Sequence, residues 1–312
     1  MRLFIIGNGF DLHHNLETGY RDYCKFLKER RLEGVLNSIV DSEYFIGNVE
    51  DITNPEDPFW SDVESNLRFD YEAMLAQSKS GYHPYPLEES EEFPDSRQLD
   101  SMKDDAVATE KNFKGVFDFT SSYLRQWMKS VDIERADTSD CYQFKADDLF
   151  VTFNYTLVLE QIYAVNPERV FHIHGCVNDE GWPPQFGNTD KEAVDVEIGY
   201  KERYNDDLLY EPVIQPASEI YVSVAERLLK DITDNKSRLE KRFLYENVDE
   251  VVVMGHSYQG SDIRYYEEFF IPKFKNAKWT IYCWAENPKV NEVDEAGKFF
   301  DKHGLNGSTI TW

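Results

Sequence analysis

Short apolar runs recur along the chain, and long polar stretches separate them. Each run is apolar over most of its length, whereas a strand with one solvent-facing side alternates apolar and polar residues. The runs therefore predict an α/β fold, in which helices cover both faces of a mostly parallel sheet. The predicted strands are residues 2–6, 148–153, 169–173, 250–254 and 279–284, with a further edge strand at 308–312.

Helical patterns fill the long gap between the first two predicted strands. Apolar residues recur at spacings of three and four over residues 20–39, 60–77 and 109–130, as they do on the buried face of a helix. The gap is far longer than the crossover helix that parallel strands require. It is therefore predicted to hold an insertion.

The predicted strands and helices divide the chain into a core and two insertions. The core comprises residues 1–21, 146–178 and 248–312, and the insertions are 22–145 and 179–247, the second with helical patterns at 220–229 and 236–245. Within the first insertion, residues 85–105 carry eight acidic and two basic side chains and two prolines. That composition predicts a mobile surface loop.

The composition of the chain excludes some classes of molecule from its expected partners. The 312 residues carry a net charge of −26, so we do not expect nucleic acid binding, which depends on clustered Lys and Arg. No apolar run approaches the ~20 residues of a membrane helix and no secretory signal is recognisable, so we expect a cytoplasmic protein that does not contact membranes. The cysteines form no CxxC pair, which argues against a structural zinc site and predicts mostly buried thiols: Cys24, Cys141, Cys176 and Cys283.

Polar residues follow four of the predicted strands directly. Because ligands bind outside the carboxyl ends of the strands in an open parallel sheet, these residues are the candidate site. Each of these four strands ends in Gly, Asn, His or Ser. One shared ligand pocket explains this recurrence better than four unrelated turns do. The candidates are Gly7, Asn8, Gly9, Phe10 and Asp11 after the first strand, Asn154 after the second, His172 and His174 at the third, and Gly255, His256, Ser257 and Asp262 after the fourth.

The turn Gly7–Asn8–Gly9 allows close approach of an anionic group to the start of the next helix. It lacks the third glycine of a GxGxxG dinucleotide fingerprint, since position 12 is Leu12. A purely structural turn explains it equally well. Asp11 is either a ligand of a ribose or amide group, or a cap of the following turn.

The other strand ends leave similar alternatives open. Asn154 is either a catalytic group or a turn former. His172 and His174 are predicted to lie on the same face of a strand, because side chains alternate, and this suits a two-histidine metal site or one buried and one active-site histidine. His256 is either a nucleotide contact or part of a helix start that Ser257 caps, with Asp262 near the positive end of that helix.

Five ordered motifs resemble the AbiH family, which takes its name from bacteriophage abortive infection. They are IGNGFDL, FWSDVESNL, TFNYTLVLEQIY, HIHG and VVMGHSYQGSDIRYY, and they span nearly the whole chain. The resemblance implies an effector of antiviral defence.

AbiH proteins are similar in turn to the sirtuin group of NAD-binding folds. That likeness implies a Rossmann-like, sirtuin-like core with NAD as the substrate and no metal. It places Asn154 and His174 on the catalytic Asn and His, Gly7, Asn8 and Gly9 on the pyrophosphate turn, and Gly255 and Ser257 on a late nucleotide contact. The four-cysteine zinc module of sirtuin deacylases is missing, so hydrolysis of NAD to nicotinamide and ADP-ribose is expected in place of protein deacylation.

Breaking the bond between nicotinamide and ribose needs a general base and a positioning group, since nicotinamide leaves from a cationic ring without an acid. We hypothesise that His174 is the base and that Asn154 holds the ribose hydroxyl and the water. His172 is expected to orient His174 or to contact the ligand. Phe10, Asp11, His256 and Asp262 complete the predicted nucleotide contacts.

Two rival functions remain open. The first is a non-enzymatic nucleotide sensor that regulates a defence assembly. The second is a metal-dependent hydrolase that uses His172, His174, His256 and Asp11. Asp11-Leu12-His13 matches the first motif of calcineurin-type phosphoesterases, but the second motif is missing because Ser257 follows His256. We also expect a homo-oligomer or a partner defence protein, because such an effector must be held inactive.

Overall fold

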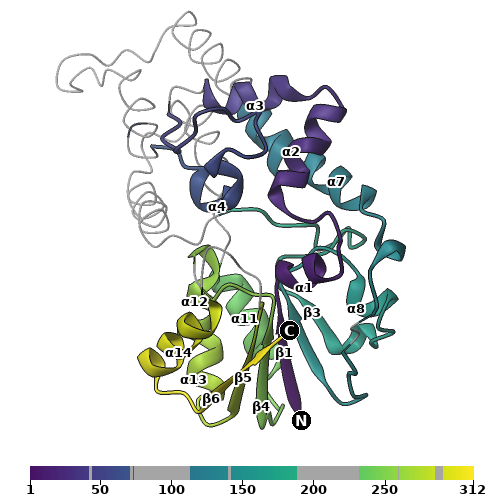
Figure 1. Cartoon of the computed structure of the whole chain (residues 1–312), viewed down its shortest axis with the longest axis vertical. Coiled ribbons are helices and arrows are strands. Elements are labelled where there is room, and N and C mark those ends of the chain that lie inside the picture. The colour runs from purple at the N-terminus through teal and green to yellow at the C-terminus, as the bar shows by residue number, and fades with distance from the viewer. Residues whose placement is uncertain are drawn as a thin grey trace, which may run out of the picture. The chain divides into compact units, whose positions relative to one another are not determined.

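The computed structural model describes residues 1–41, 44–70, 73, 113–139, 142–187, 232–258, 260–284 and 291–312 (Figure 1). The acidic loop predicted at 85–105, the helix predicted at 220–229 and Cys141 lie outside the described residues.

The described residues contain a six-stranded sheet in which every pairing is parallel. The predicted α/β class is confirmed, and each apolar run forms a strand whose ends lie within a residue or so of the predicted ones. The spatial order is β3-β2-β1-β4-β5-β6. The strands are β1 (Arg2–Ile6), β2 (Leu149–Thr152), β3 (Val170–His172), β4 (Glu250–Met254), β5 (Lys278–Cys283) and β6 (Gly307–Thr311).

The strand β1 lies inside the sheet and is buried on both faces. Leu3 and Ile5 belong to one apolar cluster, and Phe4 and Ile6 belong to another, and none of the four has any exposed area. Side chains alternate between faces along a strand, so a strand that is covered on both sides must be apolar at every position. Each such side chain stabilises the fold by about 1.5–3 kcal/mol relative to an exposed one.

Helices of the same part of the chain cover both faces of the sheet (Figure 1). The face of Leu3 and Ile5 packs against three helical segments. The first is α11 (Ile232–Arg242) and the last is α14 (Glu292–His303). The middle segment runs from α12 (Ile263–Tyr265) through a π-helical turn (Tyr266–Phe270) into α13 (Ile271–Phe274). The face of Phe4 and Ile6 packs against α1 (Asn8–His13) and α8 (Val158–Gln161). Short 3-10 turns at Ile133–Arg135, Pro167–Arg169 and Gly260–Asp262 connect these elements.

The helices of the first insertion differ from their prediction in two places. The pattern at 20–39 forms two helices, α2 (Tyr20–Glu29) and α3 (Glu33–Val40), because Arg31 adopts a positive φ of 57° that a helix cannot contain. The single helix predicted at 60–77 is wrong over residues 60–70, and residues 71, 72 and 74–77 lie outside the described part of the chain. A 3-10 turn (Pro58–Ser61) and α4 (Val63–Asn66) end before Phe69 forms a bridge with Phe45.

The third predicted helix of this insertion is observed where the structure describes it. Residues 113–117 are helical, and a π-helical turn (Asp118–Tyr123) and α7 (Leu124–Ser130) continue them. Trp60 is 2% exposed and its indole N–H donates to the Ile52 carbonyl oxygen at 3.0 Å. Trp60 is therefore a core residue, and Glu64 is also buried.

Contacts divide the chain into two compact units. The first comprises Met1–Tyr23, Arg125–Gln185 and Asp231–Trp312, and the second comprises Cys24–Leu124 and Phe186–Lys230. Residues 125–145 and 231–247, assigned from the sequence to insertions, thus group with the sheet. Cys24 and Cys283 are buried as predicted, and Cys176 is partly exposed. No helix among the described residues is long and apolar enough to cross a membrane.

Candidate functional site

The strand order turns back between β1 and β4, and two glycine turns meet at that point. The Gly9 N–H donates to the Gly255 carbonyl oxygen (N···O 2.8 Å), and the Gly7 N–H donates to that of Met254 (3.0 Å). Gly255 has a φ of +64°, and a Cβ there would lie 2.0 Å from the Phe10 nitrogen. Glycine is required because no side chain fits between the two turns.

The Gly7 and Gly9 N–H groups therefore already have acceptors inside the protein. Packing of the two turns is the role that the geometry gives these glycines, and their contact with a pyrophosphate stays a prediction. Asn8 is exposed, and its side-chain amide donates to the Thr18 carbonyl oxygen at 2.9 Å. Phe10 is buried in the apolar cluster beneath α1.

Asp11 joins α1 to the segment that follows β2. It is 1% exposed, and its carboxylate accepts hydrogen bonds from Asn154 Nδ2 at 2.9 Å and from the Thr156 hydroxyl at 2.6 Å. Burial raises the pKa of Asp11 to about 6, although both hydrogen bonds oppose the rise. Asn154 is thereby held in one orientation, and its Oδ1 atom is buried without a hydrogen-bond partner among the described residues.

His172 belongs to the same buried network. Its Nδ1 lies 3.0 Å from the Asn154 carbonyl oxygen, and its Nε2 lies 2.9 Å from Glu160 Oε1. A histidine held at both ring nitrogens is fixed in orientation. His172 therefore supports the loop that carries Asn154.

His174 faces other partners, so the prediction that it shares a strand face with His172 is wrong. The strand β3 ends at His172, and the chain then turns, with the Gly175 N–H donating to the His172 carbonyl oxygen at 3.2 Å. Alternation of side chains stops where the strand stops. The His174 ring packs against Phe153 (centroids 5.1 Å apart) and Tyr265 (5.6 Å).

One carboxylate lies between two histidines. Asp262 Oδ1 is 3.6 Å from His174 Nε2, and Asp262 Oδ2 is 3.7 Å from His256 Nε2. We call these three residues the histidine–aspartate cluster. Phe153 lines it on one side, with its ring centroid 4.0 Å from that of His256.

The proton on His256 is oriented by a buried tyrosine. The Tyr266 hydroxyl lies 3.1 Å from His256 Nδ1. Complete burial, and then the charge of Asp262, raise the pKa of Tyr266 well above its usual value, so its hydroxyl keeps its proton. When Nδ1–H of neutral His256 donates to that hydroxyl oxygen, Nε2 carries no proton and can accept one beside Asp262.

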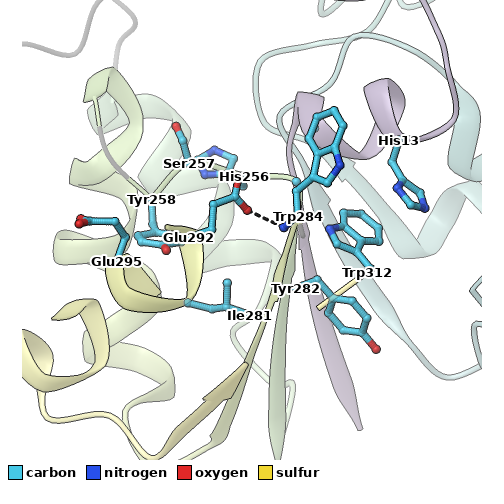
Figure 2. Close-up of a pocket in the computed structure, with 12 residues that line it drawn as sticks. His13, His256, Ser257, Tyr258, Ile281, Tyr282, Trp284, Glu292, Glu295 and Trp312 are labelled. Carbon is cyan, nitrogen blue, oxygen red and sulfur yellow. Dashed lines mark hydrogen bonds between the residues drawn. The ribbon is translucent and has the colours of Figure 1, made fainter. Parts of the chain in front are cut away.

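His256 also lines a cavity of about 230 Å³ at the carboxyl ends of β1, β4 and β5. Figure 2 shows Tyr282, Trp284 and Trp312 grouped on one side and Ser257, Tyr258 and Glu292 on the other. A second cavity of about 290 Å³ shares His13, Tyr282 and Trp312 with it. Four predicted site residues line the first cavity, namely Gly9, Gly255, His256 and Ser257.

The strand-end rule missed several residues of this cavity. Trp284 directly follows β5, so the same rule could have found it. Glu292 and Glu295 lie on α14 and Trp312 follows β6, and local patterns give no signal that these residues reach the cavity. His13, at the end of α1, also lines it.

The predicted metal ligands do not converge. Asp11 and His172 belong to the network around Asn154, whereas His174 and His256 belong to the histidine–aspartate cluster. Across the described parts of the chain, no group of three or more His, Cys, Asp or Glu side chains is arranged to hold a metal ion. This geometry gives the metal-dependent hydrolase no support.

The strand order 3-2-1-4-5-6 is that of a Rossmann-type α/β protein, and a cavity lies beside its turning point at the carboxyl edge of the sheet. The family model described as "Bacteriophage abortive infection AbiH" matches residues 3–283. The chain belongs to this family of anti-phage abortive infection proteins. No curated protein and no solved structure matched the chain.

Proposed function

We propose that this protein binds NAD in the crevice between β1 and β4 and hydrolyses it to nicotinamide and ADP-ribose as its part in abortive infection. The observation that carries the proposal is the position of His256, which lines the cavity and faces Asp262 behind it. A histidine backed by a carboxylate is a common general base.

In this reaction a bond forms between the water oxygen and C1′ of the ribose, and the bond from C1′ to the nicotinamide nitrogen breaks. Nicotinamide leaves as a neutral molecule with the electron pair of that bond. His256 accepts the proton of the water, and Asp262 stabilises the resulting imidazolium. His174 lies on the opposite side of Asp262 and is 2% exposed, so it acts through the carboxylate as a positioning residue.

Asn154 has the role of positioning the ribose. Its Nδ2 donates to Asp11, and its Oδ1 is buried and does not line the cavity, so Oδ1 must be uncovered on binding before it can accept a hydrogen bond from a ribose hydroxyl. Asp11 and His172 fix that orientation before the ligand binds, and such preorganisation contributes to rate by lowering the cost of positioning.

The test is incubation of the purified protein with NAD, with and without a phage-derived trigger, followed by chromatography of nicotinamide and ADP-ribose. We expect His256→Ala to lower the cleavage rate by at least about 100-fold, the usual contribution of a general base. His303→Ala is the matched control, since His303 lies in the last turn of α14 and is not among the residues that line the cavity. Wild type and His256→Ala that behave identically under every trigger would exclude NAD hydrolysis by this site.

A second candidate is a sensor that binds the nucleotide without cleaving it. The burial of Asn154 Oδ1 favours it, because Asn154 does not line the cavity, whereas hydrolysis needs that atom to position the ribose. A sensor predicts that His256→Ala cells still resist phage, whereas Ser257→Trp, which fills the cavity, abolishes resistance. Loss of resistance in both variants is the result expected of the enzyme.

A further inference from the structure

One wall of the cavity is aromatic. Trp312 stacks on His13, with ring centroids 4.3 Å apart and planes 12° apart, and it meets Tyr282 edge-on at 5.6 Å and 70°. Trp284 stands beside them and is 45% exposed (Figure 2). These contacts hold Trp312 in place, so its ring is a preformed stacking surface.

The charge of the cavity is negative. Glu292 and Glu295 line it, and the described lining residues include no lysine or arginine, although Glu295 pairs with Lys298 behind the cavity at 2.6 Å. Glu292 Oε2 accepts a hydrogen bond from the Trp284 backbone N–H at 2.6 Å, which fixes that carboxylate beside the aromatic wall. Burial, and then the charges of Cys283, Glu292 and Glu295, raise the pKa of Tyr258, so its hydroxyl stays protonated.

We infer that this cavity takes a cationic aromatic ring, the pyridinium of the nicotinamide half of NAD, and does not take the diphosphate or the adenine; the assignment to NAD rests on the function proposed above. Aromatic faces attract cations, and two carboxylates favour a positive ring and repel phosphate. At about 230 Å³ the cavity is smaller than the ~300 Å³ at which sites for drug-sized ligands begin, so it suits one ring with its sugar.

A nicotinamide ring bound against the aromatic wall would be oriented for the proposed hydrolysis. His256 and Gly9 line the same cavity, so a ring held against Trp312 brings its bond to ribose to the side of the cavity that carries the base. The positive charge leaves the ring as the bond breaks. Glu292 and Glu295 therefore stabilise the bound substrate more than the transition state, so their removal should raise KM and should also raise kcat.

The test uses two probes that differ by one charge, the N1-methylnicotinamide cation and neutral nicotinamide, with binding to the full chain measured by calorimetry. We expect the cation to bind about tenfold more tightly, because cation–π attraction and the two carboxylates act on it alone. Glu292→Gln should weaken binding of the cation about fivefold and leave that of nicotinamide unchanged. Trp312→Leu should weaken binding of both probes.

Asp294→Asn is the matched control, because it removes the same charge from the same turn of α14 at an exposed position that is not among the lining residues. Equal affinity for the two probes, binding of neither, or an unchanged affinity in Glu292→Gln would overturn the inference. Selective binding of the cation without cleavage of NAD would support the cavity assignment and refute the proposed hydrolysis. Cleavage of NAD together with equal affinity for the two probes would support the proposed hydrolysis and refute the assignment of the pyridinium ring to this cavity.

Discussion

Replacement of Asp11 by asparagine is expected to stabilise the protein at neutral pH. The carboxyl group is 1% exposed, and its pKa rises from the ordinary 3.8 to about 6 because burial disfavours the charged form. That difference corresponds to about 3 kcal/mol, the cost of keeping Asp11 ionised in the folded protein above pH 6. Asparagine has the same shape and can keep hydrogen bonds to Asn154 and to the Thr156 hydroxyl without paying this cost.

The same residue gives the stability a pH dependence of defined sign. Between pH 3.8 and about 6 the folded protein binds the Asp11 proton more tightly than the unfolded chain does. Stability therefore contains a contribution that is present at about pH 4 and is lost as the pH rises through about 6. Urea denaturation at pH 5 and pH 8 should show Asp11→Asn more stable than wild type, with the larger gain at pH 8.

The matched control is Asp148→Asn. Asp148 is as deeply buried as Asp11, but it pairs with Arg2 at 2.6 Å, so we expect its replacement to destabilise the protein by roughly 2–3 kcal/mol at both pH values. An Asp11→Asn variant that is less stable than wild type at pH 8, or whose gain is the same at pH 5 and pH 8, would refute the argument from burial. A confirmed gain in stability with lost function would show that the ionised carboxylate is kept for the site.

Three further variants test the local geometry. Gly255→Ala should cost at least about 2 kcal/mol in urea denaturation, because its Cβ would lie 2.0 Å from the Phe10 nitrogen at a φ of +64°; a neutral effect would contradict the crossing of the two turns. Asn291→Ala removes the cap of α14 and should cost about 1 kcal/mol by the same assay. Burial lowers the pKa of His14 in the folded state, so stability should fall as the pH drops below 6.5, and His14→Gln should flatten that part of the profile.

The strands β1, β2 and β4 were predicted correctly because nearly every residue in them is buried and therefore apolar. A strand covered on both faces, such as Arg2–Ile6, excludes polar residues from either side, so its ends coincide with the ends of the apolar run. The helix predicted over 60–77 failed for a related reason. Spacings of three and four persist there, but Asp57 and Asp62 cap separate short turns, and the chain is extended again at Phe69. Periodicity alone does not distinguish one helix from two turns and a bridge.

The sequence predicted which strand ends carry the candidate site residues. It did not predict which of these residues contact one another. The rule that ligands gather at the carboxyl edge found Gly9, Gly255, His256 and Ser257, which share one cavity. It could not show that His172 and His174 face different partners, because that depends on the residue at which β3 ends. It likewise could not show that His174 is buried behind Asp262, because that arrangement depends on tertiary packing.

The sequence by itself determined the α/β class, the positions of the strands and the family, because these depend on local apolar patterns and ordered motifs. The tertiary structure alone decided the strand order, since the strands β1 to β5 are all largely apolar and their pairing partners are set by packing over the whole sheet. It also brought His13 against Trp312, from opposite ends of the sequence, and placed Asp262 between two histidines. Contacts of this kind form only when the chain closes around its core, so they leave no local signal in the sequence.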